Sequence, residues 1–383
     1  GLRNQLLMKA LIAVISDLAT DMRVRKHASL LTEMGFDVTL IGRKSAGTVD
    51  MNILPGKAVR LHVPFRRGPL MYLSYNVMLM FQLLFRKADI YVSNDLDTLL
   101  PCFAASRLFS KPLVYDAHEY FTGQYGLPEK RFKHRVWKRL EKWLLPEIRH
   151  MMTVRESIAS LYHKEYGVNP LVIRNVAPAS DHIIPVNRRD MVNRADDLLV
   201  VFQGAGINPG RGAGELIDAM TLTDGVMLLI IGSGDIIGDI RRRVSDRGLE
   251  DKVKLVPRMP WEQMMSYTMC CDAGLSLDTD TCLNQRFSLP NKLFDYIAAG
   301  IPVVVSPLPE VSAVVNNFKC GIVLGEMTPE AISRALTALR DNRLPLESLK
   351  KGAAVARKEL TWATEKKKEQ ELFQSVIKIK VHR

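Results

Sequence analysis

Two glycine-rich loops in the second half of the chain are suited to holding an anion. The first, GAGINPGRG (204–212), follows an apolar strand-like run and precedes a helical pattern. Gly204 and Gly206 let the backbone approach a ligand closely, N–H groups at a helix start attract negative charge, and Arg211 adds several donors. Gly232 opens a similar loop, GSGD, after the next strand-like run. Such turns are common between strands and helices, so each loop alone is a weak indication of phosphate binding.

A third candidate lies in NQRFSLPNKLFDYIAAGIPVVVSPLPEV (284–311), where a polar loop leads into a short helical pattern. Ser288 or Asn291 is a candidate helix cap. Lys292 puts a positive charge at the helix end that is already positive, which is unfavourable unless an anion binds there. Asp295, one turn further on, can accept hydrogen bonds from sugar hydroxyls or pair with Lys292 on the helix surface. Capping and anion binding are compatible interpretations of this stretch.

One histidine and two aspartates of the first half follow strand-like runs. His118 comes after PLVYDA and precedes Glu119, so we expect it at the carboxyl end of a strand, although a lone histidine is more often structural. Asp95 and Asp97 come after DIYVS. Helix capping is the simpler interpretation of both aspartates.

Strand-like and helix-like patterns alternate along most of the chain, which at 383 residues is too long for one ordinary core. The strand-like runs are 10–16, 36–42, 59–63, 89–93, 112–117, 151–154 and 170–175, then 198–204, 226–232, 252–256, 273–277 and 302–306. Short β-branched runs separated by helices predict parallel sheets made of βαβ units. We therefore expect an α/β protein with two Rossmann-like doubly wound domains that face each other across a cleft. Ligands of such sheets bind beyond the carboxyl ends of the strands.

The domain boundaries follow from where this alternation lapses. We expect an N-terminal domain over 8–176, a polar linker over 177–197 and a C-terminal domain over 198–360. The remaining segment, 361–383, is predicted to be a helix that packs back on the N-terminal domain.

The net charge of +12 suggests an anionic partner. Residues 130–143 carry seven Lys or Arg against one Glu, with apolar side chains at helical spacing. A membrane-surface helix and an ordinary surface helix with a solvated basic face both fit. The apolar run 70–85 is bracketed by basic residues, but its 16 residues fall short of the roughly 20 needed to span a bilayer. A packed core helix is favoured there, with an interfacial segment as the alternative.

Cysteine usage and motif content bear on compartment and partners. The five cysteines have no metal-binding spacing and fit reduced thiols, so we expect a cytoplasmic protein. The basic and apolar segments make an anionic membrane surface at the inner face of the cell membrane a candidate partner. No apolar segment with a cleavage site follows the first residues, so no signal peptide is predicted. Recognition-helix, RNP and zinc motifs are absent from the sequence, so nucleic acid is not predicted as a partner.

The sequence resembles GT-B glycosyltransferases of glycosyltransferase family 4 over nearly its whole length. The likeness rests on FSLPNKLFDYIAAGIPVVVSPLPEV, FQGAGINPGRG followed by GELIDAM, VYDAHEYF (114–121) and TDMRVRKHASLLTEMGFDVTLIG (20–42). These motifs are fairly specific for the family and unspecific for the sugar. The resemblance makes the first domain the acceptor side and the second domain the nucleotide-sugar side.

The resemblance also implies roles for single residues. Arg211 stands where the family holds the donor pyrophosphate, Asp295 where a carboxylate grips the ribose, and His118 where a histidine faces the transferred sugar. Lys292 is a second candidate phosphate contact. The chain departs from the family at Phe287, where a glutamate usually contacts the sugar, and at positions 205–206, where an arginine is usual.

A DxD-like motif, Asp278-Thr279-Asp280, lies in the second half. In a GT-B-like chain, cations and helix ends hold the diphosphate in place of a metal. We therefore assign no metal ligand and expect no cofactor beyond the donor substrate.

These observations predict a metal-independent, retaining glycosyltransferase that moves a sugar from a UDP- or GDP-linked donor to a glycan or lipid-linked acceptor. Arg211 and Lys292 would neutralise the leaving diphosphate, with Gly204, Gly206, Gly232, Ser288, Asn291 and Asp295 lining the nucleotide-sugar site. A sugar-nucleotide 2-epimerase of the same architecture and a noncatalytic nucleotide-sugar-binding protein are alternatives. The base, sugar, acceptor and oligomeric state do not follow from the sequence.

Overall fold

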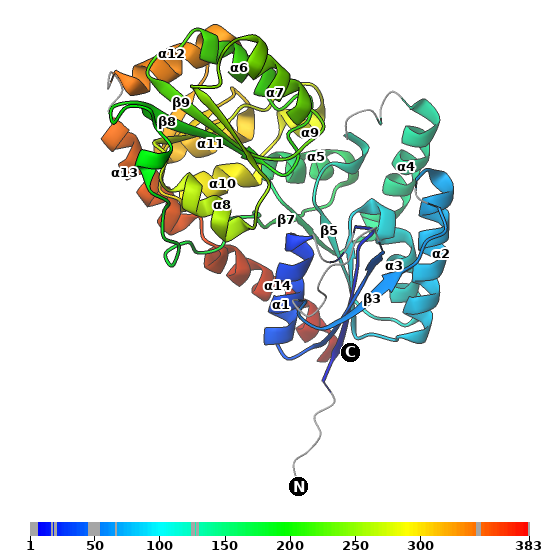
Figure 1. Ribbon diagram of the computed structural model, residues 1–383. Coiled ribbons are helices and arrows are strands. Elements are labelled where there is room, and N and C mark those ends of the chain that lie inside the picture. Colours follow the sequence, from blue (N-terminus) through cyan, green and yellow to red (C-terminus); the bar gives the residue numbers. More distant parts are fainter. Residues whose placement is uncertain are drawn as a thin grey trace. The chain divides into compact units, whose positions relative to one another are not determined.

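The computed structural model describes residues 7–16, 18, 21–44, 54–65, 67–123, 127, 130–341 and 346–381. The chain divides into two compact units, each with its own parallel sheet (Figure 1). The first unit contains the residues up to Arg174 together with those from Lys366 onward, and the second contains Asn175–Glu365. Residues 1–6, on which the signal-peptide prediction bears, lie outside the described residues.

The first unit is built on a seven-stranded sheet with the order β3-β2-β1-β4-β5-β6-β7. Its strands are β1 (Lys9–Ala13), β2 (Asp37–Arg43), β3 (Lys57–Leu61), β4 (Ile90–Asn94), β5 (Leu113–Ala117), β6 (His150–Thr153) and β7 (Leu171–Val172). β4 and β5 pair in parallel, so their carboxyl ends are neighbours. Asp95 and His118, which directly follow these two strands, are thereby brought to the same edge of the sheet.

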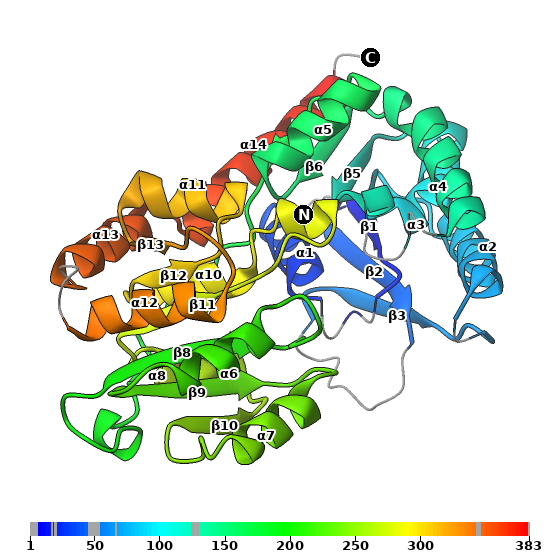
Figure 2. The same ribbon diagram turned by 90° about the horizontal axis from the view of Figure 1, so that it is seen from above.

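Helices cover both faces of this sheet. They are α1 (Met22–Glu33), α2 (Pro69–Phe85), α3 (Leu96–Leu108), α4 (Arg131–Leu144), α5 (Glu156–Tyr166) and α14 (Trp362–Val381), with 3₁₀ turns η2 (Phe121–Gly123) and η3 (Leu145–Glu147). α1 and α14 lie on one face and α2, α3 and α4 on the other (Figures 1 and 2). The start of α1 is capped by Asp21, whose carboxylate accepts from the Val24 N–H at 3.1 Å.

The second unit is built on a six-stranded parallel sheet with the order β10-β9-β8-β11-β12-β13. Its strands are β8 (Leu198–Gly204), β9 (Val226–Gly232), β10 (Val253–Pro257), β11 (Ala273–Ser276), β12 (Val303–Val305) and β13 (Gly321–Val323). Its helices are α6 (Ala213–Thr221), α7 (Ile237–Asp246), α8 (Trp261–Thr268), α9 (Leu283–Arg286), α10 (Asn291–Ala298), α11 (Pro309–Phe318), α12 (Pro329–Arg340) and α13 (Leu346–Glu359), and η4 (Arg188–Asp190) is a 3₁₀ turn.

The apolar run of β8 supplies both cores of the second unit. Alternate residues of a strand point to opposite faces, so Val200 and Phe202 join a cluster with α6, α7 and α12. Leu199 and Val201 join a second cluster with α10, α11 and α13. A strand buried on both faces needs this uninterrupted apolar sequence.

The predicted α/β architecture of two Rossmann-like domains is confirmed. Strand β13 is not among the predicted strands, because its three half-buried residues form a short edge strand with little apolar signal. None of the described helices is long and apolar enough to cross a bilayer. α2, which covers the apolar run 70–85, buries only one side.

Candidate active site

The two predicted phosphate-binding cations meet at one buried carboxylate. Asp278, 1% exposed, accepts a hydrogen bond from Arg211 Nη1 at 2.7 Å. Lys292 Nζ lies 3.7 Å from the other oxygen of the same carboxylate. Ser288 Oγ also donates to Asp278, at 2.9 Å. Residues from the loop after β8, the loop after β11 and the start of α10 therefore converge on one point.

Lys292 is nearly enclosed, with 11% of its side chain exposed, and its ammonium lies 4.5 Å from the centre of the Phe202 ring. Burial lowers the pKa of Lys292, and Asp278 partly opposes this shift. Arg211 is 37% exposed and can reach outward. One carboxylate faces two cationic side chains, so the cluster favours a further anion beside Arg211.

The glycine loops are locked together by backbone contacts. Gly232 pairs in register with Gly204 and has φ +142°, and a Cβ there would lie 1.9 Å from the Gly204 oxygen. Gly212 has φ +76°, and a Cβ there would lie 2.1 Å from the Leu277 oxygen. Ser233 N–H donates to the Gly204 oxygen at 3.2 Å. Only glycine fits Gly212 and Gly232 without moving the neighbouring backbone.

The start of α10 differs from the expected capping arrangement. Pro290 is the N-cap residue, and no described side chain caps the helix. The prediction that Ser288 or Asn291 caps the helix is therefore wrong. Ser288 donates to Asp278. The exposed side chain of Asn291 accepts a hydrogen bond from Asn175 at 3.1 Å.

The carboxylate of Asp295 is held between two neighbours. Trp261 Nε1 donates to one oxygen at 2.9 Å and Gln203 Nε2 to the other at 3.3 Å. These contacts fix the side chain in one orientation. A carboxylate oxygen has two lone pairs and can accept more than one hydrogen bond.

A hollow lies at the carboxyl ends of β9 and β10, next to the Gly232 loop. Its volume is ≈ 270 Å³, and its lining includes Ser233, Arg241, Leu255 and Arg258. It combines apolar walls, glycine backbone and two guanidinium groups. Apolar walls with a few polar groups are typical of small-molecule sites.

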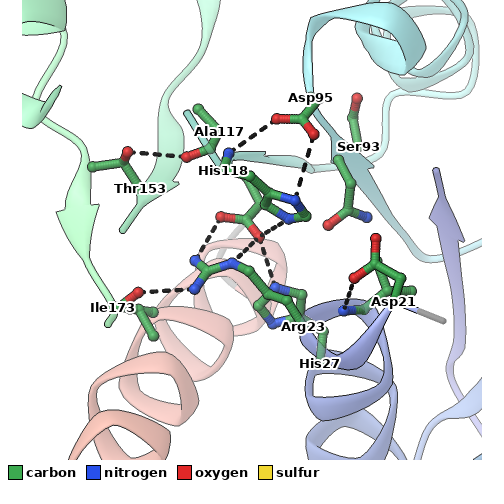
Figure 3. Close-up of polar contacts among 12 residues, drawn as sticks. Asp21, Arg23, His27, Ser93, Asp95, Ala117, His118, Thr153 and Ile173 are labelled. Carbon is green, nitrogen blue, oxygen red and sulfur yellow. Dashed lines mark hydrogen bonds and ion pairs between the residues drawn. The ribbon is translucent and has the colours of Figure 1, made fainter. Parts of the chain in front are cut away.

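In the first unit, His118 belongs to a buried ionic network (Figure 3). Asp116, fully buried, accepts from Arg23 Nε and Nη2, both at 2.7 Å. His27 Nε2 lies 2.7 Å and His118 Nε2 3.0 Å from the same carboxylate. On the other side of its ring, His118 Nδ1 lies 3.4 Å from Asp95 Oδ2.

The charges in this network perturb one another. Burial by itself raises the pKa of Asp116, but the charges of Arg23, His118 and His27 outweigh it and hold that pKa well below its usual value. Burial lowers the pKa of His118, but Asp95 and Asp116 raise it to about 10. With a carboxylate at each ring nitrogen, His118 is an imidazolium at neutral pH.

The network extends to the C-terminal helix. His27 Nδ1 lies 2.5 Å from Oε1 of Glu369 in α14, and Glu369 is fully buried. His27, Asp116 and His118 offer atoms within 4.8 Å of one another, as metal ligands do. Asp116 is already the acceptor for Arg23 and both histidines, and Arg23 would repel an added cation. The arrangement fits a hydrogen-bonded ion network better than a metal centre.

Three residues gain a role that the sequence analysis did not give them. Asp278 is the common partner of the two cations, and its neighbour Asp280 pairs with Arg286 at 3.0 Å. Asp116 orients His118. The available signal for Asp116 was its position two residues before His118, since alternate strand residues share a face. For Asp278 the DxD pattern marked the residue but suggested a different chemistry.

Comparison with known proteins identifies the class. Sequence profiles described as Glycosyltransferase Family 4 and Glycosyl transferases group 1 match residues 22–179 and 187–358. Chitobiosyldiphosphodolichol beta-mannosyltransferase of Candida albicans is 22% identical over 382 residues, covering 89% of this chain and 83% of the relative.

Solved structures agree on the fold. Sucrose-phosphate synthase from Thermosynechococcus elongatus superposes with a TM-score of 0.77 at 16% identity, covering 97% of this chain and all of the other. Anabaena HepE in complex with UDP-glucose gives a TM-score of 0.68 at 16% identity, covering 96% of this chain and 100% of HepE. The fold is that of the GT-B glycosyltransferases. The chain belongs to glycosyltransferase family 4, with the group 1 profile over its second unit, and is a glycosyltransferase.

Proposed function

We propose that the enzyme transfers a sugar from a UDP- or GDP-linked donor to a hydroxyl of a glycan or lipid-linked acceptor. The observation that carries the proposal is the convergence of Arg211 and Lys292 on Asp278, which leaves positive charge beside the glycine loops. The leaving nucleoside diphosphate gains negative charge during transfer. Cations held in place before the reaction stabilise that charge without reorganisation.

The donor's parts can be assigned to the elements of the second unit. The diphosphate would contact Arg211, Lys292 and the backbone of the Gly204–Gly206 and Gly232 loops. The ribose hydroxyls would bind Asp295, whose orientation Trp261 fixes. We place the nucleoside in the hollow beside Gly232, because its guanidinium groups and apolar walls suit a base.

The transfer is proposed to be metal-independent and to retain the anomeric configuration. Two cations already serve the diphosphate, and His118 would contact the transferred sugar. We assign no protein nucleophile, because no carboxylate of the site is a clear candidate for one. Activity in EDTA and the anomeric configuration of the product by NMR test the two statements. Metal-dependent turnover, or inversion at the anomeric carbon, would contradict them.

The names of similar proteins support the substrate classes. HepE was solved with UDP-glucose, and one relative is named for a chitobiosyldiphosphodolichol acceptor. Another relative, 26% identical over 222 residues (52% of this chain and 50% of the relative), is a D-inositol 3-phosphate glycosyltransferase of Jonesia denitrificans. HepE thus supports a sugar-nucleotide donor, and the Candida albicans relative supports a lipid-linked saccharide as acceptor.

An anionic membrane surface at the inner face of the cell membrane is part of the proposal. α2 exposes an apolar stripe made of Leu70, Leu73, Val77, Phe81 and Phe85. The basic helix α4 packs beside it, with the rings of Tyr72 and Trp137 5.4 Å apart. Apolar side chains flanked by cationic ones are the pattern of a surface that binds anionic lipid.

Flotation with vesicles tests the membrane contact. We expect binding to phosphatidylglycerol vesicles that weakens with salt, and loss of binding in Phe81→Ser/Phe85→Ser, because the apolar stripe is interrupted. Val355→Ser, an exposed apolar position on α13, is the matched control. Binding that ignores lipid charge and salt would remove the membrane claim.

Calorimetry with UDP and GDP tests the donor site. Arg211→Ala should weaken binding of the preferred nucleoside diphosphate by at least about tenfold, because a hydrogen bond to a charged group contributes about 1.5–3 kcal/mol. Arg334→Ala removes an exposed guanidinium elsewhere in the unit and should leave affinity unchanged. Equal affinity of wild type and Arg211→Ala would sink the assignment of the loop. If the enzyme converts the donor into an epimeric sugar nucleotide without any acceptor, it is an epimerase instead.

A further inference from the structure

Asp95 has a backbone conformation that aspartate rarely adopts. Its φ is 61° and its ψ 168°, a region populated almost only by glycine. The expected capping role does not explain it, because Asp95 stands at the N-cap position of α3 without any capping hydrogen bond from its side chain within the described chain. Such strain persists where the surrounding structure enforces it, and it concentrates at functional sites.

Three contacts hold Asp95 in this conformation. Its backbone N–H donates to the backbone carbonyl oxygen of Asp116 at 2.9 Å, which ties the end of β4 to β5. Its Oδ1 accepts from the His118 N–H at 3.0 Å, and its Oδ2 lies 3.4 Å from His118 Nδ1. The carboxylate is therefore turned away from α3 and toward His118 (Figure 3).

The carboxylates on either side of His118 differ in access. Asp116 is fully buried, whereas 23% of the Asp95 side chain is exposed. His118 faces a carboxylate at each ring nitrogen and is positively charged, so it cannot accept a proton. Among the three, Asp95 is the accessible group with free lone pairs for a proton.

The surroundings of Asp95 suit a group that gains and loses a proton near neutral pH. Burial raises its pKa to about 6, with His118 opposing and Glu119 and Asp116 reinforcing the shift. Asp97, two residues on and buried, faces the same region. A base works best when its pKa lies close to the operating pH.

We propose that Asp95 is the catalytic base of the acceptor site: it accepts the hydrogen bond of the attacking hydroxyl and takes up its proton during transfer. The hydroxyl oxygen forms a bond to the anomeric carbon of the donor sugar, and the bond from that carbon to the phosphate oxygen breaks. The electron pair leaves with the nucleoside diphosphate, and the hydroxyl proton moves to an Asp95 oxygen and then to solvent. The inference rests on the proposed function, since it needs a sugar-nucleotide donor.

Two substitutions test it in the full-length enzyme. Asp95→Gly fits the backbone conformation and removes the carboxylate, and Asp95→Asn keeps the oxygen that accepts from the His118 N–H but does not take up a proton. We expect kcat at saturating acceptor to fall at least about 100-fold in both, with nucleoside diphosphate affinity within about twofold of wild type. Ser110→Gly relieves a positive φ at the far end of α3 and should leave kcat unchanged.

A pH profile separates a base from a structural residue. In the wild type, kcat/KM for the acceptor should rise through a pH of about 6 and then level off, and this limb should be absent from the residual activity of Asp95→Asn. If Asp95→Asn keeps kcat within about threefold, or raises only the acceptor KM, the proton goes elsewhere and the inference falls. If the wild type neither binds nucleoside diphosphates nor transfers sugar, the proposed function falls first.

Discussion

At the scale of single residues, the second unit shows how one buried carboxylate organises two cations. A cation placed at a helix start, such as Lys292, is unfavourable by itself. The structure provides Asp278 and the Phe202 ring as partners, so the side chain is kept in place even before an anion binds. The position of Lys292 in the sequence predicts a negative charge close to its ammonium group. Asp278 supplies part of that charge from within the protein.

Removal of the shared carboxylate should destabilise the fold. Asp278→Ala leaves Lys292 enclosed without its partner, so we expect the free energy of unfolding to fall by about 3–5 kcal/mol. Asp280→Ala breaks only an exposed pair with Arg286 and should cost about 0–1 kcal/mol. Urea denaturation with the two variants side by side measures both. Equal losses would show that Asp278 does not hold Lys292 in the way described.

At the scale of elements, α14 joins the first unit although it lies at the other end of the chain. Its buried Phe373 and Val376 pack there, and Lys366 pairs with Glu33 of α1. Glu369 reaches His27, so the C-terminal helix and α1 share the ion network that orients His118. A helix that supplies a buried charge is held by more than apolar area.

This network should make stability depend on pH. Burial lowers the pKa of His27, but Glu369 and Asp116 raise it above its usual value, as Asp95 and Asp116 do for His118. A histidine whose pKa is raised by folding contributes its full stabilisation of the folded state below its unfolded-state pKa of about 6.5. This stabilisation is lost as the pH rises through the folded-state pKa. We therefore expect the melting temperature to fall from pH 6.5 to 9, and His27→Gln to show a shallower fall.

His150 provides the control for that experiment. It is half-buried, and burial together with Arg149 lowers its pKa. Its effect on the pH dependence of stability is therefore confined to pH values at or below about 6.5. Above that pH, the melting temperature of His150→Gln should fall with the same slope as that of the wild type. A His27→Gln slope as steep as the wild type would contradict the coupling of His27 to folding.

At the scale of the whole molecule, the two units divide the proposed work. The cations, the glycine loops, Asp295 and the hollow all belong to Asn175–Glu365, whereas His118 and Asp95 belong to the first unit. A ligand that binds only the folded form of one unit protects that unit by mass action.

Hydrogen exchange on the full chain tests this division. With saturating UDP or GDP, amides in 204–212, 232–236 and 288–295 should exchange more slowly, because the diphosphate contacts their backbone. Amides in β1, β2 and β3, which carry none of the proposed donor contacts, serve as the internal control and should exchange at an unchanged rate. Protection centred on the first unit would contradict the proposed donor site.

The amino-acid sequence alone predicted the repeating βαβ pattern, the glycine loops and the candidate residues Arg211, Lys292 and His118. These follow from local periodicity and from residue types whose chemistry does not depend on distant partners. The short edge strand β13 was not predicted, because three residues are too few to show a periodic pattern of burial.

Which charged side chains meet became evident only from the folded chain. Asp278 joins Arg211 across 67 positions, and Glu369 meets His27 across 342. Such pairings depend on how strands are ordered in a sheet and on where a distant helix packs, and spacing along the chain does not encode either. The strained backbone of Asp95 is likewise a product of its contacts with β5, since the local sequence favoured an ordinary helix cap.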